Sequence, residues 1–113
     1  ARHLKLPSVF TERVSGEFQL RRGFEIKPGA KVLIVEDVIT TGKSSMECAQ
    51  VVKKLKGNVI GFACIVDRSN KQSSINLEIV SQITFDIPVF KANEIPSKLK
   101  SIPAIKPGSR NLI

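Results

Sequence analysis

The stretch that decides the fold reads Val32-Leu33-Ile34-Val35-Glu36-Asp37-Val38-Ile39-Thr40-Thr41-Gly42. Its four branched apolar residues, 32–35, are typical of a strand buried on both faces of a parallel sheet. Two adjacent carboxylates do not suit a core, so we expect the strand to finish at Glu36 and Asp37, in a surface crevice. A helix should then open at Lys43-Ser44-Ser45. Ligands of α/β proteins bind in crevices at this end of parallel strands.

The turn between this strand and the helix offers small residues and free backbone N–H groups, which make a ready anion site. Small or hydroxyl side chains let the backbone approach a phosphate at Thr40, Thr41, Gly42 and Ser44. An ordinary helix N-cap by Thr40 or Thr41 is the plainer interpretation, but a cap needs only one such residue. Carboxylates for sugar hydroxyls beside an N–H cradle for a phosphate predict a ribose-phosphate site.

The rest of the chain predicts a single domain with a mostly parallel sheet, because a strand–helix–strand order favours a βαβ unit. Alternation, helical periodicity and turn residues predict a short strand over 6–12, a hairpin of 10–14 and 18–22 around Ser15-Gly16, a helix over 44–56, a strand over 59–66, two strands over 75–79 and 83–89, a short helix over 94–100, and irregular chain over 103–113.

Composition narrows the class of partner. The 113 residues carry a net charge of +8, which suits nucleic acid, an anionic membrane or a polyanionic small substrate. With no Trp or Tyr, the chain lacks an evident stacking platform for nucleic acid, and no apolar run reaches the ~20 residues of a membrane span. Cys48 and Cys64 are expected as small buried residues without a disulfide, and His3 as an exposed residue. We therefore expect a small-molecule partner, with no nucleic acid and no membrane.

The stretch from Glu36 to Gly42 resembles the binding motif for phosphoribosyl pyrophosphate (PRPP) in type I phosphoribosyltransferases, and the orotate phosphoribosyltransferase family in particular. Further similar segments are Leu20-Arg21-Arg22-Gly23-Phe24, Lys27-Pro28-Gly29, Val66-Asp67-Arg68 and residues 105–110. The resemblance implies an α/β fold: a mostly parallel sheet flanked by helices, with a β-hairpin loop and with the N-terminal part of the fold missing. It implies one partial domain over 1–113, a catalytic-loop hairpin over 11–27 and a PRPP-binding strand–loop–helix over 32–45.

The implied activity is transfer of a phosphoribosyl group from PRPP to orotate, which gives orotidine 5′-monophosphate and pyrophosphate in pyrimidine biosynthesis. By the same resemblance we expect Mg²⁺ held mainly by PRPP, a homodimer whose sites borrow a loop across the interface, and a cytoplasmic location. A purine-base phosphoribosyltransferase, a non-catalytic PRPP-sensing regulator and an inactive fragment remain open as alternatives.

Residue roles follow from the resemblance. The expected catalytic residues are Glu36, Asp37 and Arg22, with the carboxylates beside a ribosyl cation and Arg22 at the departing pyrophosphate. The expected PRPP-binding residues are Arg13, Glu36, Asp37, Val38, Ile39, Thr40, Thr41, Gly42, Lys43 and Ser44. Thr40 and Arg68 are the expected orotate-binding residues. The plainer interpretations are a solvated charged hairpin for Arg21 and Arg22, and an ion pair of Arg68 with Asp67 or with a surface glutamate.

Overall fold

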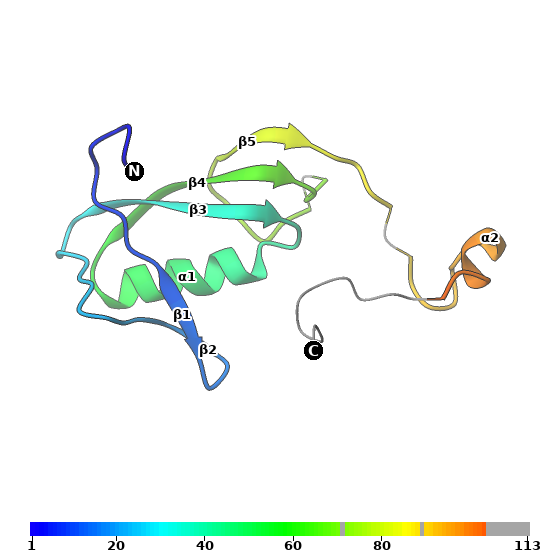
Figure 1. The fold of residues 1–113 in the computed structure, drawn as a ribbon, viewed down its shortest axis with the longest axis horizontal. Coiled ribbons are helices and arrows are strands. Elements are labelled where there is room, and N and C mark those ends of the chain that lie inside the picture. The colour runs from blue at the N-terminus through cyan, green and yellow to red at the C-terminus, as the bar shows by residue number, and fades with distance from the viewer. Residues whose placement is uncertain (71, 89, 104–113) are drawn as a thin grey trace.

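The structure is a computed structural model that describes residues 1–70, 72–88 and 90–103. Along the chain it contains β1 (Thr11–Val14), β2 (Glu17–Leu20), β3 (Lys31–Ile39), α1 (Lys43–Lys54), β4 (Asn58–Asp67), β5 (Ile79–Thr84) and α2 (Ser97–Lys100), as Figure 1 shows. The similar segment at 105–110 and most of the irregular chain expected over 103–113 lie outside the described residues.

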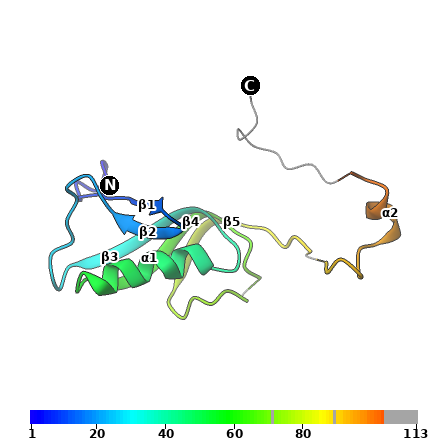
Figure 2. The ribbon, with the colours of Figure 1, turned by 90° about the horizontal axis from the view of Figure 1, so that it is seen from below.

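A three-stranded parallel sheet, in the order β3-β4-β5, forms the centre of the molecule. The connection from β3 to β4 runs through α1, which lies against one face of the sheet (Figure 2). Ile34, Phe62 and Cys64 are buried on this face, where residues of α1 pack against them. Burial of these apolar side chains is what holds strand to helix. The expectation of a mostly parallel α/β sheet is confirmed.

The opposite face of the sheet is bare in the part of the chain that the structure describes. Leu33, Val35, Ile65 and Val80 alternate with the buried residues, and they are 50%, 69%, 58% and 55% exposed. Figures 1 and 2 show a helix beneath this sheet but none above it among the described residues. The strand at 32–35 was expected to be buried on both faces, but among the described residues only the face toward α1 is covered.

The hairpin of β1 and β2 is confirmed, with antiparallel pairing from Thr11↔Leu20 to Val14↔Glu17. Ser15 and Gly16 form its turn with φ values of 50° and 90°. Positive φ at both central residues is the geometry that matches the twist of a two-residue hairpin, and Gly adopts it at little cost. The hairpin lies beside α1 (Figure 1).

Several expected boundaries were wrong. β3 does not finish at the acids, because Glu36 pairs with Cys64 and Ile39 with Asp67 in the ladder to β4. One strand, β5, replaces the two expected over 75–79 and 83–89, and it ends where its partner β4 ends, at Asp67↔Thr84. Residues 6–10 form no strand, and the helix expected over 94–100 is confined to α2. Alternation shows which residues share a face, but a strand also needs a neighbour to pair with.

Beyond β5 the chain leaves the sheet, and α2 lies apart from it in Figures 1 and 2. Apart from the half-buried Ile95, residues 90–103 are exposed, so this segment adds little to the core. Among the described residues, each helix is too short or too polar to cross a membrane.

Candidate ribose-phosphate site

The two acids of β3 have different surroundings. Glu36 is half-buried, and the hydroxyl of Ser45 in the first turn of α1 donates to its Oε1 at 3.2 Å. Asp37 is exposed, and its Oδ1 accepts the N–H of Val38 at 2.7 Å. Neighbouring residues of a strand point to opposite faces, which explains the contrast. Glu36 is thus held by α1, whereas Asp37 keeps carboxylate oxygen available for a ligand.

Residues 40–44, here called the phosphate loop, connect β3 to α1. Gly42 is the N-cap of α1 with a φ of 77°, and its carbonyl accepts the first helical N–H, from Met46, at 2.9 Å. Because Gly42 has no side chain, no hydroxyl caps the helix in the usual way. A 3.4 Å hydrogen bond runs from Lys43 N–H to the hydroxyl oxygen of Thr41, Oγ1. The N-cap interpretation therefore does not account for the hydroxyl side chains of this loop.

The side chains of the phosphate loop are exposed at Thr40, Thr41, Lys43 and Ser44. The side chain of Ile39, another expected PRPP-binding residue, is 1% exposed and belongs to the core. A ligand could reach Ile39 only through its backbone. The expected contact at Ile39 therefore stays a prediction for its backbone alone, while Val38 is 41% exposed.

A segment far along the chain supports the phosphate loop from behind. The backbone N–H and the hydroxyl of Ser74 both donate to the carbonyl of Thr41, at 3.0 and 3.2 Å. Ile75 is buried directly under Gly42, and a Cβ on Gly42 would lie 2.9 Å from its Cγ1. Sequence reasoning connected neither residue with the loop, because Ile75 was expected in a strand, Ser74 belongs to no motif, and both act through contacts across more than thirty residues.

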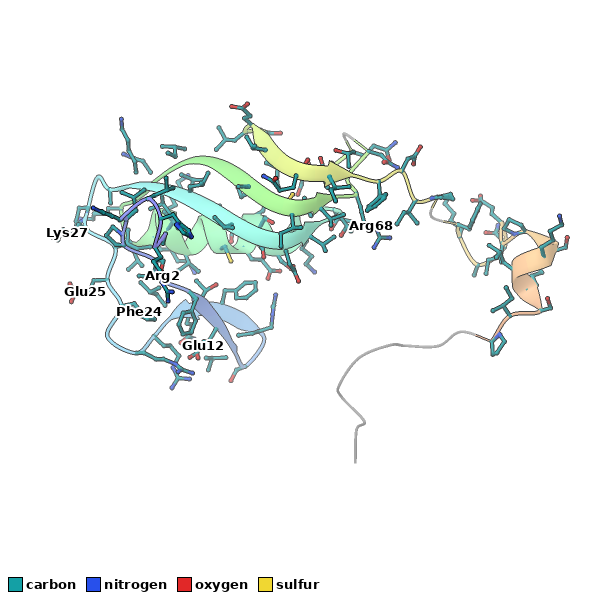
Figure 3. The ribbon with its side chains drawn as sticks, turned by 45° about the horizontal axis from the view of Figure 1, so that its top comes forward. Arg2, Glu12, Phe24, Glu25, Lys27 and Arg68 are labelled. Carbon is teal, nitrogen blue, oxygen red and sulfur yellow. The ribbon has the colours of Figure 1, made fainter. Side chains whose placement is uncertain are left out.

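The end of β4 lies beside the end of β3. Arg68 donates its backbone N–H to the carbonyl of Ile39 at 2.8 Å, and Figure 3 shows its side chain at this edge of the sheet. Asp67 accepts the N–H of Ser69 at 2.8 Å, and within the described ranges no ion pair joins it to Arg68. The Nε of Arg68 is buried and has no hydrogen-bond partner there. A buried donor without an acceptor calls for a ligand or water, so the ion-pair interpretation of Arg68 is not supported.

The arginines of the hairpin are engaged elsewhere. Arg22 donates to Glu12 Oε1 from Nε at 2.9 Å and from Nη2 at 2.5 Å, and Arg13 pairs with Glu47 of α1 at 2.6 Å. Figure 3 places Glu12 on the hairpin, apart from the sheet edge that carries Arg68. The structure thus brings together residues 36–44 and Arg68, but it does not bring Arg13 or Arg22 to the phosphate loop.

An apolar groove of about 270 Å³ lies between the hairpin, β3 and α1, with Phe10, Phe18, Leu33 and Glu36 among its lining residues. None of residues 37–44 lines it. Cys48 lies in the same groove, where burial raises the pKa of its thiol; the hydrogen bond with Thr11 at 3.2 Å opposes this shift, and the charge of Glu36 adds to it. A raised pKa leaves less thiolate, which makes Cys48 a poor nucleophile.

Both cysteines are free, as expected. Burial raises the pKa of Cys64 too, with a further contribution from the charge of Asp67. In the described part of the chain, no group of three or more His, Cys, Asp or Glu residues is arranged to hold a metal ion.

Comparisons with known proteins agree with this geometry. The family profile described as "Phosphoribosyl transferase domain" matches residues 3–94. Orotate phosphoribosyltransferases of Caulobacter vibrioides and Phenylobacterium zucineum are 45% and 47% identical to the chain over 112 residues. These matches cover 99% of the chain and 58% of each relative, so the chain spans a little over half of their length.

Among solved structures, adenine phosphoribosyltransferase from Thermoanaerobacter pseudethanolicus aligns with a TM-score of 0.53 at 23% identity, over 72% of this chain and 51% of that one. The adenine phosphoribosyltransferase of Rhodothermus marinus aligns with a TM-score of 0.50 at 22% identity, with the same coverage. At these identities the likeness concerns the fold alone. Together with the match over residues 3–94, it shows that the chain belongs to the phosphoribosyl transferase domain family.

Proposed function

We propose that the chain is the PRPP-binding part of an orotate phosphoribosyltransferase, a cytoplasmic enzyme of pyrimidine synthesis. The reaction transfers the phosphoribosyl group of PRPP to orotate and releases pyrophosphate. The observation that carries the proposal is the exposed phosphate loop directly after Asp37, with its outward hydroxyls and its support from Ser74 and Ile75. The relatives named orotate phosphoribosyltransferase support the choice of orotate.

In this proposal the two acids act on the ribose. As pyrophosphate leaves, positive charge develops on the ribosyl ring, and a fixed carboxylate lowers the energy of that charge. Asp37 accepts hydrogen bonds from the ribose hydroxyls with the oxygen that Val38 does not occupy. Glu36, held by Ser45, adds negative charge from within the site and needs no reorganisation during the reaction.

The phosphate loop binds the 5′-phosphate of PRPP. Backbone N–H groups at the start of α1, together with the hydroxyls of Thr40, Thr41 and Ser44, supply the donors that phosphate oxygens accept. The helix dipole adds about 0.3–1 kcal/mol for an exposed anion. Lys43 is exposed and contributes charge near the phosphate without a fixed contact.

Arg68 and Thr40 recognise orotate at the shared end of β3 and β4. A guanidinium group matches the planar geometry of a carboxylate, and the orotate carboxylate would supply the acceptor that Arg68 Nε lacks among the described residues. A base without a carboxylate would leave this donor unsatisfied, which disfavours hypoxanthine and adenine.

Arg13 and Arg22 would reach pyrophosphate only after the hairpin moves. Their present partners, Glu47 and Glu12, are replaced by phosphate oxygens when the hairpin closes over the site, in the same subunit or across a homodimer interface. Exposed ion pairs contribute about 0–1 kcal/mol each, so this exchange costs little. A closed hairpin then offsets the charge of the leaving group.

A magnesium ion fits this donor set as a companion of PRPP. Carboxylate oxygens and phosphates are the ligands that Mg²⁺ prefers, and it commonly keeps one or two protein carboxylates with the substrate as its main ligand. Asp37 is the exposed carboxylate that could take this part. The ion, when bound, would neutralise charge on the pyrophosphate.

The test is a substrate panel on the full-length protein, with PRPP and Mg²⁺ in every reaction and orotate, hypoxanthine or adenine as the acceptor. We expect pyrophosphate release that depends on orotate. Release with adenine or hypoxanthine alone would replace this proposal by a purine-base transferase. PRPP binding without release for any base would indicate a PRPP-sensing regulator or an inactive fragment.

A further inference from the structure

We propose that Ser74 is a positioning residue for phosphate binding, acting through the carbonyl of Thr41. This inference rests on the proposed function, since it names an additional residue for the same site. Ser74 lies in the connection between β4 and β5, outside the segments that resemble the family motif. Its contacts with the phosphate loop are two hydrogen bonds to the carbonyl of Thr41.

The physical argument starts from the peptide bond between Thr41 and Gly42. A trans peptide is planar, so its C=O and its N–H point to opposite sides. Ser74 holds the Thr41 carbonyl with two donors, its N–H at 3.0 Å and its Oγ at 3.2 Å. The N–H of Gly42 must therefore point away from Ser74, and it has no acceptor among the described residues.

Ile75 fixes the same peptide from a second direction. It is buried beneath Gly42, where even a single added carbon would come within 2.9 Å of its side chain. Gly42 also has a φ of 77°, a conformation that it adopts without strain. Ile75 therefore keeps the loop from moving toward the sheet, and Ser74 keeps the Thr41–Gly42 peptide from rotating.

A fixed N–H direction matters because a donor bound to phosphate is effective only when it is already aimed. If the Thr41–Gly42 peptide could rotate, its carbonyl would spend time facing the anion, and binding would have to stop that motion. Preorganised donors avoid this cost. Ser74 therefore affects affinity for the 5′-phosphate, but not the chemistry at the ribose or the recognition of the base.

The experiment compares Ser74→Ala, Ser74→Thr and Ser101→Ala in the full-length enzyme. Ser74→Ala removes the hydroxyl donor and keeps the backbone donor, and Ser74→Thr restores a hydroxyl. Ser101→Ala is the matched control, because its hydroxyl also donates to a backbone carbonyl, that of Lys98 at 3.4 Å, in the segment around α2. The probes are ribose 5-phosphate and inorganic pyrophosphate, titrated by calorimetry, and PRPP and orotate in steady-state kinetics.

We expect Ser74→Ala to weaken the binding of ribose 5-phosphate, and to raise KM for PRPP, by about five- to ten-fold. This is the usual effect of one hydrogen bond. Pyrophosphate affinity, KM for orotate and kcat should stay within about two-fold, as should every constant of Ser101→Ala. Ser74→Thr should recover most of the loss. Unchanged ribose 5-phosphate affinity in Ser74→Ala, or an equal loss for pyrophosphate, would overturn the inference. Failure of the unsubstituted enzyme to bind PRPP would instead overturn the proposed function.

Discussion

The phosphate loop and the hairpin are held in place by different kinds of contact. The loop is supported by backbone hydrogen bonds at the carbonyls of Ile39 and Thr41 and by the packing of Gly42 on Ile75. Among the described residues, the hairpin is joined to α1 by the exposed ion pair of Arg13 with Glu47 and by the hydrogen bond of Thr11 with Cys48. Arg21 and Arg22 pair with Glu12 within the hairpin region, and the three arginine side chains are 45–67% exposed. Backbone contacts against a core are hard to exchange, whereas exposed ion pairs exchange readily. We infer that the loop is preorganised for a ligand and that the hairpin can move.

The largest effect should come from Asp37→Asn, which removes the free carboxylate at the ribose. We expect kcat to fall by about 100- to 1,000-fold, because charge stabilisation in the transition state is lost. The melting temperature should stay nearly unchanged, since Asp37 is exposed.

The control for Asp37→Asn is Glu94→Gln, which removes an exposed acid whose nearest partner is Lys91 at 3.8 Å, in the segment around α2. Its kcat should equal that of the unsubstituted enzyme. A normal kcat in Asp37→Asn would reject the role given to the acid pair.

Arg68→Ala tests whether Arg68, at the end of β4 beside the loop, recognises orotate. Loss of a guanidinium–carboxylate contact should raise KM for orotate by about 10- to 100-fold, and KM for PRPP should change much less. Steady-state kinetics with each substrate varied in turn measures both. Equal changes in the two KM values would show that Arg68 supports the fold of the site and does not select the base.

Gly42→Ala and Gly23→Ala compare the loop with the end of the hairpin directly. Their φ values are 77° and 72°, so both alanines carry a similar backbone cost of about 1 kcal/mol. Only at Gly42 would the new methyl group also meet Ile75, whereas nothing lies within 4 Å at Gly23. Urea unfolding should therefore show Gly42→Ala to be less stable by a further ~1–3 kcal/mol. Equal destabilisation would mean that the loop is not packed on Ile75.

Arg22→Ala and Glu12→Gln probe the hairpin with the smallest expected effects. Arg22→Ala should lower kcat by about ten-fold, through loss of a contact to the leaving pyrophosphate, while affinity for ribose 5-phosphate stays the same. Glu12→Gln frees Arg22 without removing it, so kcat should hold or rise slightly. If Arg22→Ala weakens the binding of ribose 5-phosphate as much as Ser74→Ala does, the separate roles proposed for the loop and the hairpin are wrong.

Local sequence patterns predicted the framework of the fold well. The apolar run at 32–35 and the turn at Ser15-Gly16 predicted a parallel strand and a hairpin, because burial and turn conformation act over a few residues. The end of β3 was misplaced because the ladder to β4 continues through Glu36 to Ile39. Hydrogen bonding to a neighbouring strand outweighs the local preference of two acids.

The support of the phosphate loop could not be predicted in the same way. The alternation of Ile75 and Ile79 indicated a strand, yet Ile75 is buried under Gly42 and only Ile79 enters β5. Ser74 carried no signal, since a lone serine in a connection is ordinary. Contacts of this kind depend on how β4 and β5 place their connection in space. The ion-pair partners of Arg13 and Arg22 were not predicted either, because they depend on how the hairpin folds and packs on α1.

The central claim is that residues 36–44 bind a sugar that carries a 5′-phosphate. Calorimetric titration of the full-length protein with PRPP and Mg²⁺ tests it most directly, with Asp37→Asn and Ser74→Ala measured alongside. The account predicts saturable binding of one PRPP per site, weakened in both variants. Absence of binding heat at several temperatures, with folded protein, would contradict it.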